Sequence, residues 1–219
     1  MINSLIDHTL LVPTATNAQI ETLCREAVEH SFFSVCVNPS YVSTCAAILT
    51  NSEVKVCTVV GFPLGATTTE VKVFEVKNAI QNGADEIDMV VNIGHVLDNK
   101  WLDVEQEISQ IKMACNGKLL KVIFETSLLT DEQISKLCDI CSKTGADFVK
   151  TSTGFSNGGA TVEHVRLMRD NVKPDMGVKA SGGVRTKEIA QAMINAGASR
   201  IGTSAGVSIT NGTKAQSNY

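Results

Sequence analysis

The sequence is poor in aromatic residues, which make up only 5% of its 219 residues. A core of this composition has to be filled by aliphatic side chains such as Val, Ile and Leu. The formal net charge of −4 argues against broad electrostatic binding to nucleic acid or to an anionic membrane. No apolar run approaches the roughly 18 residues of a membrane span, and the N-terminus lacks the features of a secretory signal. The composition therefore predicts a cytoplasmic globular protein.

The seven cysteines are an odd number for a disulfide framework and predict reduced thiols. The one close pair, Cys138 and Cys141, lies in a helical pattern without a second pair at zinc spacing. We interpret the two as buried residues of one helix face, with metal or redox chemistry as the alternative. The four histidines are dispersed, without the spacing of a metal site, and are interpreted as structural or surface residues. His8 is the histidine most open to another role, and neither a metal nor a cofactor is predicted.

Short apolar runs rich in β-branched residues recur along the chain and are typical of strands. Seven clear runs are 34–38, 55–60, 86–91, 121–125, 147–151, 177–181 and 200–204, and a weaker one is 5–9. Helical patterns fill the intervals between them. Three of these helices have a capping box, in which a Thr oxygen and a Gln or Glu side chain satisfy the first N–H groups. The boxes are Thr16-x-x-Gln19, Thr67-x-x-Glu70 and Thr130-x-x-Gln133.

Three joints, at 82–85, 144–147 and 196–199, repeat a Gly-Ala step that ends a helix in the left-handed conformation. Alternating helices and strands predict a parallel sheet with right-handed crossovers. Seven or eight units favour the α/β class and a single (β/α)8 TIM barrel over residues 1–219, with a flexible C-terminal tail from about residue 207. An open doubly wound sheet is the alternative, but the Gly-rich nucleotide-binding motifs typical of it do not occur.

Charged residues that interrupt the predicted strands are candidates for chemistry, because barrel active sites lie at the carboxyl ends of strands. Asp88 alternates with the apolar Ile87 and Met89, so it is expected to point into the barrel. Lys150 and Lys179 have the same inward parity on consecutive strands about 4.8 Å apart. Two ammonium groups this close oppose each other's charge, so one is expected to lose its proton and act as a Schiff-base nucleophile. A buried structural ion pair is the alternative for all three residues.

Glycine clusters follow the last two predicted strands, at 182–183 and 202–206. Loops at these places in a barrel commonly bind phosphate, because glycine lets backbone N–H groups approach an anion. The two clusters together predict a phosphorylated substrate. The candidate phosphate-binding residues are Gly154, Gly182, Gly183, Val184, Arg185, Gly202, Thr203 and Ser204.

Several motifs together resemble the deoxyribose-phosphate aldolase family of class I aldolases, over essentially the whole chain. They are Lys150-Thr-Ser-Thr-Gly154, Val178-Lys-Ala-Ser-Gly-Gly-Val-Arg185, Glu86-Ile-Asp-Met-Val-Val-Asn-Ile-Gly94, Val35-Cys-Val-Asn-Pro39 and Ile6-Asp-His-Thr9. The resemblance implies a cofactor-free lyase that cleaves 2-deoxy-D-ribose 5-phosphate reversibly to D-glyceraldehyde 3-phosphate and acetaldehyde. Its partner would be a small sugar phosphate, not nucleic acid or a membrane, and the chain could pair as a homodimer.

The same resemblance assigns roles to individual residues. Lys150 would be the Schiff-base lysine, and Lys179 the neighbour that tunes its pKa and moves protons. Asp88 would relay protons, and Tyr219 is carried over as a candidate at the end of the tail. Three further residues are placed beside the pocket: Asp7, Cys36 and Thr151.

Two other functions stay open at this point. One is a different phosphate-binding class I enzyme, such as a transaldolase-like protein or another sugar-phosphate aldolase, which the release of acetaldehyde would distinguish. The other is a sugar-phosphate-binding barrel without catalysis, which the presence of Lys150, Lys179 and Asp88 disfavours.

Overall fold

The computed structural model describes residues 2–213, which form a closed barrel of eight parallel strands in chain order. The strands are β1 (Ile6–Leu10), β2 (Ser34–Val37), β3 (Lys55–Val60), β4 (Glu86–Val90), β5 (Leu119–Ile123), β6 (Phe148–Lys150), β7 (Gly177–Ser181) and β8 (Arg200–Thr203). Each strand pairs in parallel with the next, and β8 pairs with β1 to close the sheet. The predicted barrel is therefore confirmed, and the open-sheet alternative is excluded.

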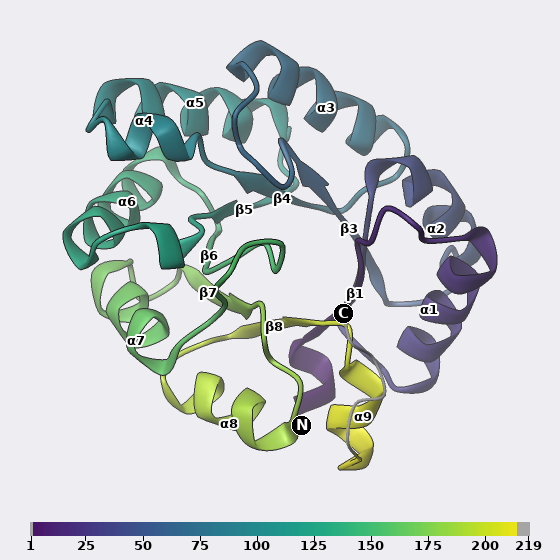
Figure 1. Cartoon of the computed structure of the whole chain (residues 1–219). Helices are drawn as coiled ribbons and strands as arrows, with labels where there is room; N and C mark the ends of the chain where they lie inside the picture. The colour runs from purple at the N-terminus through teal and green to yellow at the C-terminus, as the bar shows by residue number, and fades with distance from the viewer. Residues whose placement is uncertain (1, 214–219) are drawn as a thin grey trace.

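Helices surround the strands, as Figure 1 shows. The α-helices are α1 (Asn17–Glu29), α2 (Val42–Ile48), α3 (Thr69–Gln81), α4 (Ile93–Leu97), α5 (Trp101–Ala114), α6 (Asp131–Thr144), α7 (Val162–Asn171), α8 (Lys187–Asn195) and α9 (Gly206–Asn211). Short 3-10 segments are η1 (Ile2–Leu5), η2 (Pro39–Tyr41) and η3 (Thr126–Leu128). Within residues 2–213, no helix has both the length and the apolar character needed to cross a membrane.

Two of the three predicted capping boxes are present, at 16–19 and 130–133. The third prediction, at Thr67, is wrong by one residue. Thr68 is the N-cap of α3, because it has the extended backbone of that position and its hydroxyl oxygen accepts from the Val71 N–H at 3.5 Å. Glu70 consequently falls at the second helical position, one residue too early to complete a capping box.

The Gly-Ala joints and β5 show how the backbone redirects the chain. Gly83, Gly145 and Gly197 all have positive φ, between 76° and 110°, as the joints require. β5 ends at residue 123, two residues earlier than predicted. Glu125 causes this early end, because its left-handed φ of 57° turns the chain into η3.

Apolar side chains fill the layer between the strands and the helices. The outward residues Ile87 and Met89 of β4 are fully buried there, as their alternation with Asp88 predicted. Cys138 and Cys141 are buried in α6, and both thiols are free. Inside the barrel, a small apolar cluster lies beside buried charged side chains. That cluster consists of Leu11, Cys36, Cys57 and Val59.

The chain around residue 207 is helical, whereas the sequence analysis expected a tail to begin there. Residues 206–211 form α9, and Ile209 anchors this helix because it packs into the core. Tyr219, the candidate at the end of the predicted tail, lies outside the described residues.

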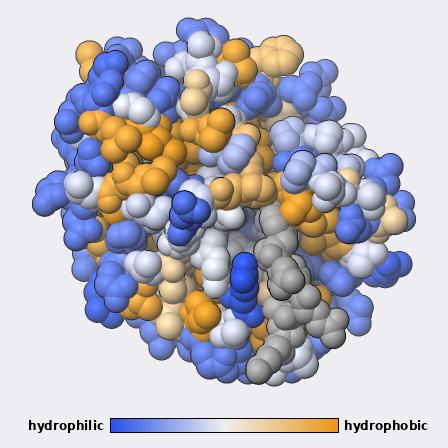
Figure 2. Space-filling model, in the orientation of Figure 1, coloured by the Kyte–Doolittle hydropathy of each residue, from blue (hydrophilic) through white to orange (hydrophobic). Residues whose placement is uncertain are grey.

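Apolar side chains also gather at the surface beside α4, on the face that Figure 2 shows. A groove there is lined mainly by apolar residues of the loops after several strands. They are Pro63, Leu64, Ala66, Ile93, Leu128 and Phe155. Leu64 is 72% exposed and Phe155 is 40% exposed, so the groove presents apolar side chains to solvent.

Candidate active site

The two predicted lysines and Asp88 meet inside the barrel. Lys150 ends β6 and stands directly beside Lys179 of β7 in the strand register. Both amines donate to the same atom, Asp88 Oδ2, at 2.7 Å from Lys150 Nζ and 2.8 Å from Lys179 Nζ. All three side chains are almost completely buried. A carboxylate oxygen therefore lies between the two amines that the sequence analysis treated as a pair of like charges.

Six charged side chains inside the barrel form a closed ring in which acids and bases alternate. We call this set the charge ring, and its members in order are Asp7, Arg200, Glu86, Lys121, Asp88 and Lys179. Arg200 Nη1 lies 2.7 Å from Asp7 Oδ1 and 3.1 Å from Glu86 Oε2. Lys121 Nζ lies 2.6 Å from Glu86 Oε2 and 2.8 Å from Asp88 Oδ1. Lys179 closes the ring, because it forms ion pairs with both Asp88 and Asp7.

Lys150 is attached to the charge ring without being part of it. Each base of the ring contacts two carboxylates, but Lys150 forms an ion pair with Asp88 alone among the residues 2–213. The ring contains three carboxylates and three cations, so its formal charge is zero. A protonated Lys150 is consequently one cation more than the carboxylates of the ring need.

The contacts within the charge ring shift the pKa values of Asp88, Lys179 and Lys121 in the direction that keeps these groups ionised. Burial alone would raise the pKa of the Asp88 carboxyl, but Lys121, Lys150 and Lys179 hold it well below its usual range. Burial would lower the pKa of the Lys179 amine, but Asp7 and Asp88 raise it above its ordinary value. The pKa of Lys121 is raised in the same way, against burial, by carboxylates that include Asp88 and Glu86. The surroundings of Lys179 therefore favour its protonated form.

Sequence reasoning missed three members of the charge ring, namely Glu86, Lys121 and Arg200. A signal for them was present, because each interrupts or begins an apolar strand with the inward parity of its neighbours. Glu86 is two residues before Asp88 on the same face of β4. Lys121 stands beside Asp88 in the register of β4 and β5, and Arg200 stands beside Lys179 in that of β7 and β8.

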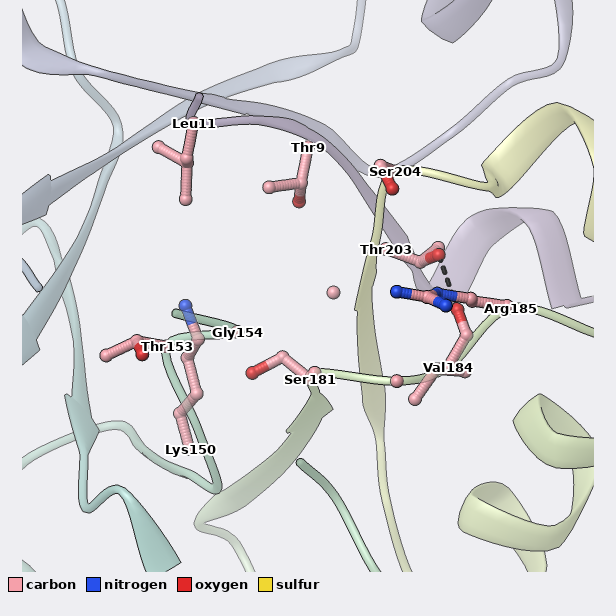
Figure 3. Close-up of a pocket in the computed structure, with 13 residues that line it drawn as sticks. Thr9, Leu11, Lys150, Thr153, Gly154, Ser181, Val184, Arg185, Thr203 and Ser204 are labelled. Carbon is pink, nitrogen blue, oxygen red and sulfur yellow. Dashed lines mark hydrogen bonds between the residues drawn. The ribbon is translucent and has the colours of Figure 1, made fainter. Parts of the chain in front are cut away.

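A cavity of about 80 Å³ opens above Lys150 at the carboxyl ends of the strands. Figure 3 shows the Lys150 amine and the Arg185 guanidinium pointing into it from opposite sides. All eight candidate phosphate-binding residues line this cavity, together with Thr9, Leu11, Thr153 and Ser181. The Thr203 hydroxyl donates to the Val184 carbonyl at 2.6 Å, which joins the two glycine-containing loops.

Glycine is required where these loops approach one another. Gly182 has a φ of 85°, a conformation that other residues rarely adopt, and a Cβ added to it would lie 3.0 Å from the Gly159 Cα. Gly202 leaves room for the neighbouring lysine, because a Cβ there would lie 2.9 Å from Lys179 Cε. Gly182 therefore lets two loops at the cavity approach each other, and Gly202 leaves room for the Lys179 side chain.

The three residues that were placed beside the pocket do not line it. Asp7 lies deeper in the barrel, where its carboxylate belongs to the charge ring and also accepts from the Ser34 hydroxyl at 2.7 Å. Cys36 belongs to the small apolar cluster inside the barrel. Thr151 is buried, and its hydroxyl donates to the Ser181 carbonyl at 3.0 Å. Thr151 therefore joins the ends of β6 and β7.

One buried group has the atom types of a metal site but not suitable surroundings. One ligand atom each from Cys36, Cys57 and Asp88 lies within 4.8 Å of the others. Asp88, however, already receives three ammonium groups, and Lys121 Nζ lies 3.4 Å from Cys57 Sγ. A cation placed here would be repelled by these ammonium groups. His8 lies apart from this group, and its Nε2 pairs with Glu26 at 2.8 Å.

The fold and the cavity define a (β/α)8 barrel with buried amines beneath a small hollow rich in glycine and basic groups. Barrels commonly bind a phosphorylated substrate at this position, in the loops after the seventh and eighth strands. Lysine amines at strand ends suit covalent chemistry with a carbonyl carbon.

Comparison with known proteins supports this class and gives the family. The family described as DeoC/LacD family aldolase matches residues 2–212. Deoxyribose-phosphate aldolase 1 of Vibrio vulnificus (strain YJ016) is 70% identical over 211 residues, which cover 96% of each chain. The chain belongs to the DeoC/LacD aldolase family.

Solved structures agree with this result. A putative deoxyribose-phosphate aldolase from Coccidioides immitis superimposes with a TM-score of 0.94 at 47% identity, over 96% of this chain and 84% of that one. The deoxyribose phosphate aldolase from Aeropyrum pernix, described as a unique tetrameric structure, gives a TM-score of 0.89 at 38% identity. That similarity covers 96% of this chain and 89% of the Aeropyrum chain.

Proposed function

We propose that this aldolase cleaves 2-deoxy-D-ribose 5-phosphate reversibly to D-glyceraldehyde 3-phosphate and acetaldehyde, through a Schiff base on Lys150. The observation that carries the proposal is the position of the Lys150 amine. It enters the cavity from one side, while Arg185 and the glycine-containing loops occupy the other. A sugar phosphate held by these loops would present its aldehyde end to the amine. Remote binding of the phosphate would then orient the reacting carbon.

In the proposed reaction, the neutral amine of Lys150 attacks C1 of the open-chain sugar. Loss of one water gives an iminium, which accepts the electron pair of the C2–C3 bond as that bond breaks. The C3 hydroxyl loses its proton in the same step, so glyceraldehyde 3-phosphate leaves and an enamine remains. Protonation of the enamine at C2 and uptake of one water release acetaldehyde and restore the amine.

Asp88 and Lys179 serve this reaction as a proton relay. One proton leaves the C3 hydroxyl as the bond breaks, and one proton is added to C2 in the following step. The relay therefore needs to hold a proton only between these two steps. The lowered pKa of Asp88 makes this carboxylate a weak base, which suits a transient acceptor that works through water. Lys179 keeps its proton beside Asp88 and is therefore placed to donate rather than to form an imine.

Borohydride trapping tests the Schiff base. Wild-type protein incubated with deoxyribose 5-phosphate and borohydride is expected to gain a stable adduct on the peptide that contains Lys150. Lys150→Ala should abolish the adduct. Lys118→Ala should keep it, since this half-exposed lysine pairs with the similarly exposed Asp85 and does not line the cavity. An adduct that persists in Lys150→Ala would falsify the assignment.

Product analysis tests the substrate. Acetaldehyde release from deoxyribose 5-phosphate is expected from purified protein, and activity should survive treatment with EDTA. Release of a different aldehyde would instead favour another sugar-phosphate aldolase. Loss of activity on chelation would contradict a metal-independent mechanism.

The thiols and the surface support proposals for where the enzyme functions and how it assembles. All seven cysteines are buried and free, which supports function in the reducing cytoplasm.

The exposed apolar groove beside α4 supports association of the chain with itself, as a homodimer. Light scattering coupled to size-exclusion chromatography would measure the assembly directly, and a monomer at micromolar concentration would contradict it.

A further inference from the structure

The charges of the ring affect which buried amine can lose its proton most easily. This inference rests on the proposed Schiff base. Removing the proton from Lys121, Lys179 or Arg200 would leave the three carboxylates of the ring with only two ring cations. Removing the proton from Lys150 leaves the ring complete, with three carboxylates and three cations. Buried charges are costly unless they are paired, so the surplus cation is the one that is easiest to neutralise.

We propose that Lys121 and its partner Glu86 are positioning residues, which complete the neutral charge ring and thereby make Lys150 the amine that loses its proton. Neither residue lines the cavity that contains Lys150. Both act through Asp88. Lys121 occupies Asp88 Oδ1, which leaves Oδ2 to be shared by Lys150 and Lys179. Glu86 holds Lys121 in place and is itself neutralised by Arg200.

Other titratable groups surround Lys150 in the barrel interior and at its mouth. Beyond the ring members Asp7, Glu86, Asp88, Lys121, Lys179 and Arg200, they are Cys36, Cys57, Glu125 and Arg185. Glu125 accepts hydrogen bonds from Thr153, and within residues 2–213 no Lys or Arg pairs with it. Burial raises the pKa of the Cys57 thiol, whereas a hydrogen bond with Cys57 lowers that of Cys36. A Cys36→Ser background therefore removes this thiol from the titration.

The proposal predicts opposite effects for two charge-removing variants. Lys121→Met leaves the ring short of one cation, so Lys150 is retained as an ammonium group to replace it. Glu86→Gln leaves the ring with one cation too many, so Lys150 gives up its proton more readily. The double variant Lys121→Met/Glu86→Gln retains two carboxylates and two cations, which makes Lys150 the surplus cation again.

The measurement is the initial rate of reductive trapping of acetaldehyde on Lys150 with cyanoborohydride, followed by mass spectrometry from pH 5 to pH 10. Lys121→Met is expected to move the pH midpoint of trapping upward by about one unit or more, and thus to slow trapping at pH 7 by about tenfold or more. Glu86→Gln is expected to move the midpoint downward. The double variant should return it toward the wild-type value.

Lys72→Met is the matched control. Lys72 is also fully buried and forms an ion pair with a buried carboxylate, Glu107, at 2.7 Å, which joins the outer helices α3 and α5. Its amine also donates to the Val90 carbonyl at the end of β4, but it contacts no member of the charge ring among the described residues. Lys72→Met is expected to lower the stability of the protein and to leave the pH midpoint of trapping unchanged. A structural defect would move both ring variants in the same direction, or lower the trapped fraction at every pH.

The outcomes separate the two proposals. Absence of an adduct in the wild type refutes the Schiff base itself. Normal trapping in the wild type, combined with midpoints that do not move or that move in the same direction in both single variants, refutes the role of the ring. If Lys121→Met fails to fold, Glu86→Gln alone still decides the question, because a midpoint that stays or rises in this variant contradicts the proposal.

Discussion

Replacement of Asp88 by Asn tests the electrostatics of the barrel interior directly. The carboxylate receives Lys121, Lys150 and Lys179 at 2.7–2.8 Å and is fully buried. Asn has nearly the same size but no charge, so the ring opens and the ammonium groups lose their shared partner. Removal of one partner of a buried ion pair typically costs about 3–5 kcal/mol. For a chain of this length, the expected fall in Tm is roughly 6–20 °C.

The same variant has a defined pH dependence. A carboxyl whose pKa is lowered by folding stabilises the native state above its unfolded pKa of about 3.9. That contribution is lost as the pH falls below this value toward the folded pKa, and Asp88 belongs to this case. The free energy of unfolding in urea should therefore differ most between wild type and Asp88→Asn at pH 7. The difference should shrink as the pH falls below about 4.

Asp98→Asn serves as the control for this prediction. Asp98 pairs with Lys100 at 3.1 Å, but its side chain is 63% exposed, so its loss should cost less than about 1 kcal/mol. The electrostatic reasoning is refuted if Asp88→Asn also unfolds within about 1 kcal/mol of wild type at pH 7. It is equally refuted if the gap between the two proteins stays constant into acid.

Three further substitutions probe the cavity and its surroundings. Arg185→Leu should lower kcat/KM for deoxyribose 5-phosphate by about 10–100-fold but leave kcat/KM for unphosphorylated deoxyribose unchanged. Equal losses of kcat/KM for the two substrates would contradict phosphate binding by Arg185. Gly202→Ala places a methyl group 2.9 Å from Lys179 Cε, so kcat should fall about tenfold or more while circular dichroism stays native. Cys138→Ala should leave kcat unchanged, because its thiol is buried among helices, and a loss of activity would point to thiol chemistry.

The barrel could be predicted from the sequence because its signals are local. The alternation of Ile87, Asp88 and Met89 indicates which side chains of β4 face inward. Gly145 marks the end of α6 because it adopts the left-handed backbone conformation of a C-cap. Boundaries were less predictable, since they depend on single backbone conformations. The left-handed Glu125 ends β5 early, and the extended backbone of Thr68 moves the start of α3 by one residue.

The site was only partly predictable, because parity gives the direction of a side chain but not its partner. Strand parity brought Asp88, Lys150 and Lys179 together correctly. The same rule applied to Lys121 and Arg200 would have placed two more cations inside the barrel. It would not have shown that acids and bases alternate around a closed ring, because that order depends on the register of all eight strands and on the reach of each side chain.

The register also changes how the two neighbouring lysines are understood. As like charges side by side, Lys150 and Lys179 would compete for one proton, and nothing in their positions would decide which amine loses it. The ring distinguishes the two amines, because Lys179 contacts two carboxylates and Lys150 contacts one. In the proposed mechanism, the nucleophile is the lysine that has fewer carboxylate partners and that also lines the cavity. The division between covalent chemistry on Lys150 and proton donation by Lys179 that we propose therefore follows the number of carboxylates that each amine contacts.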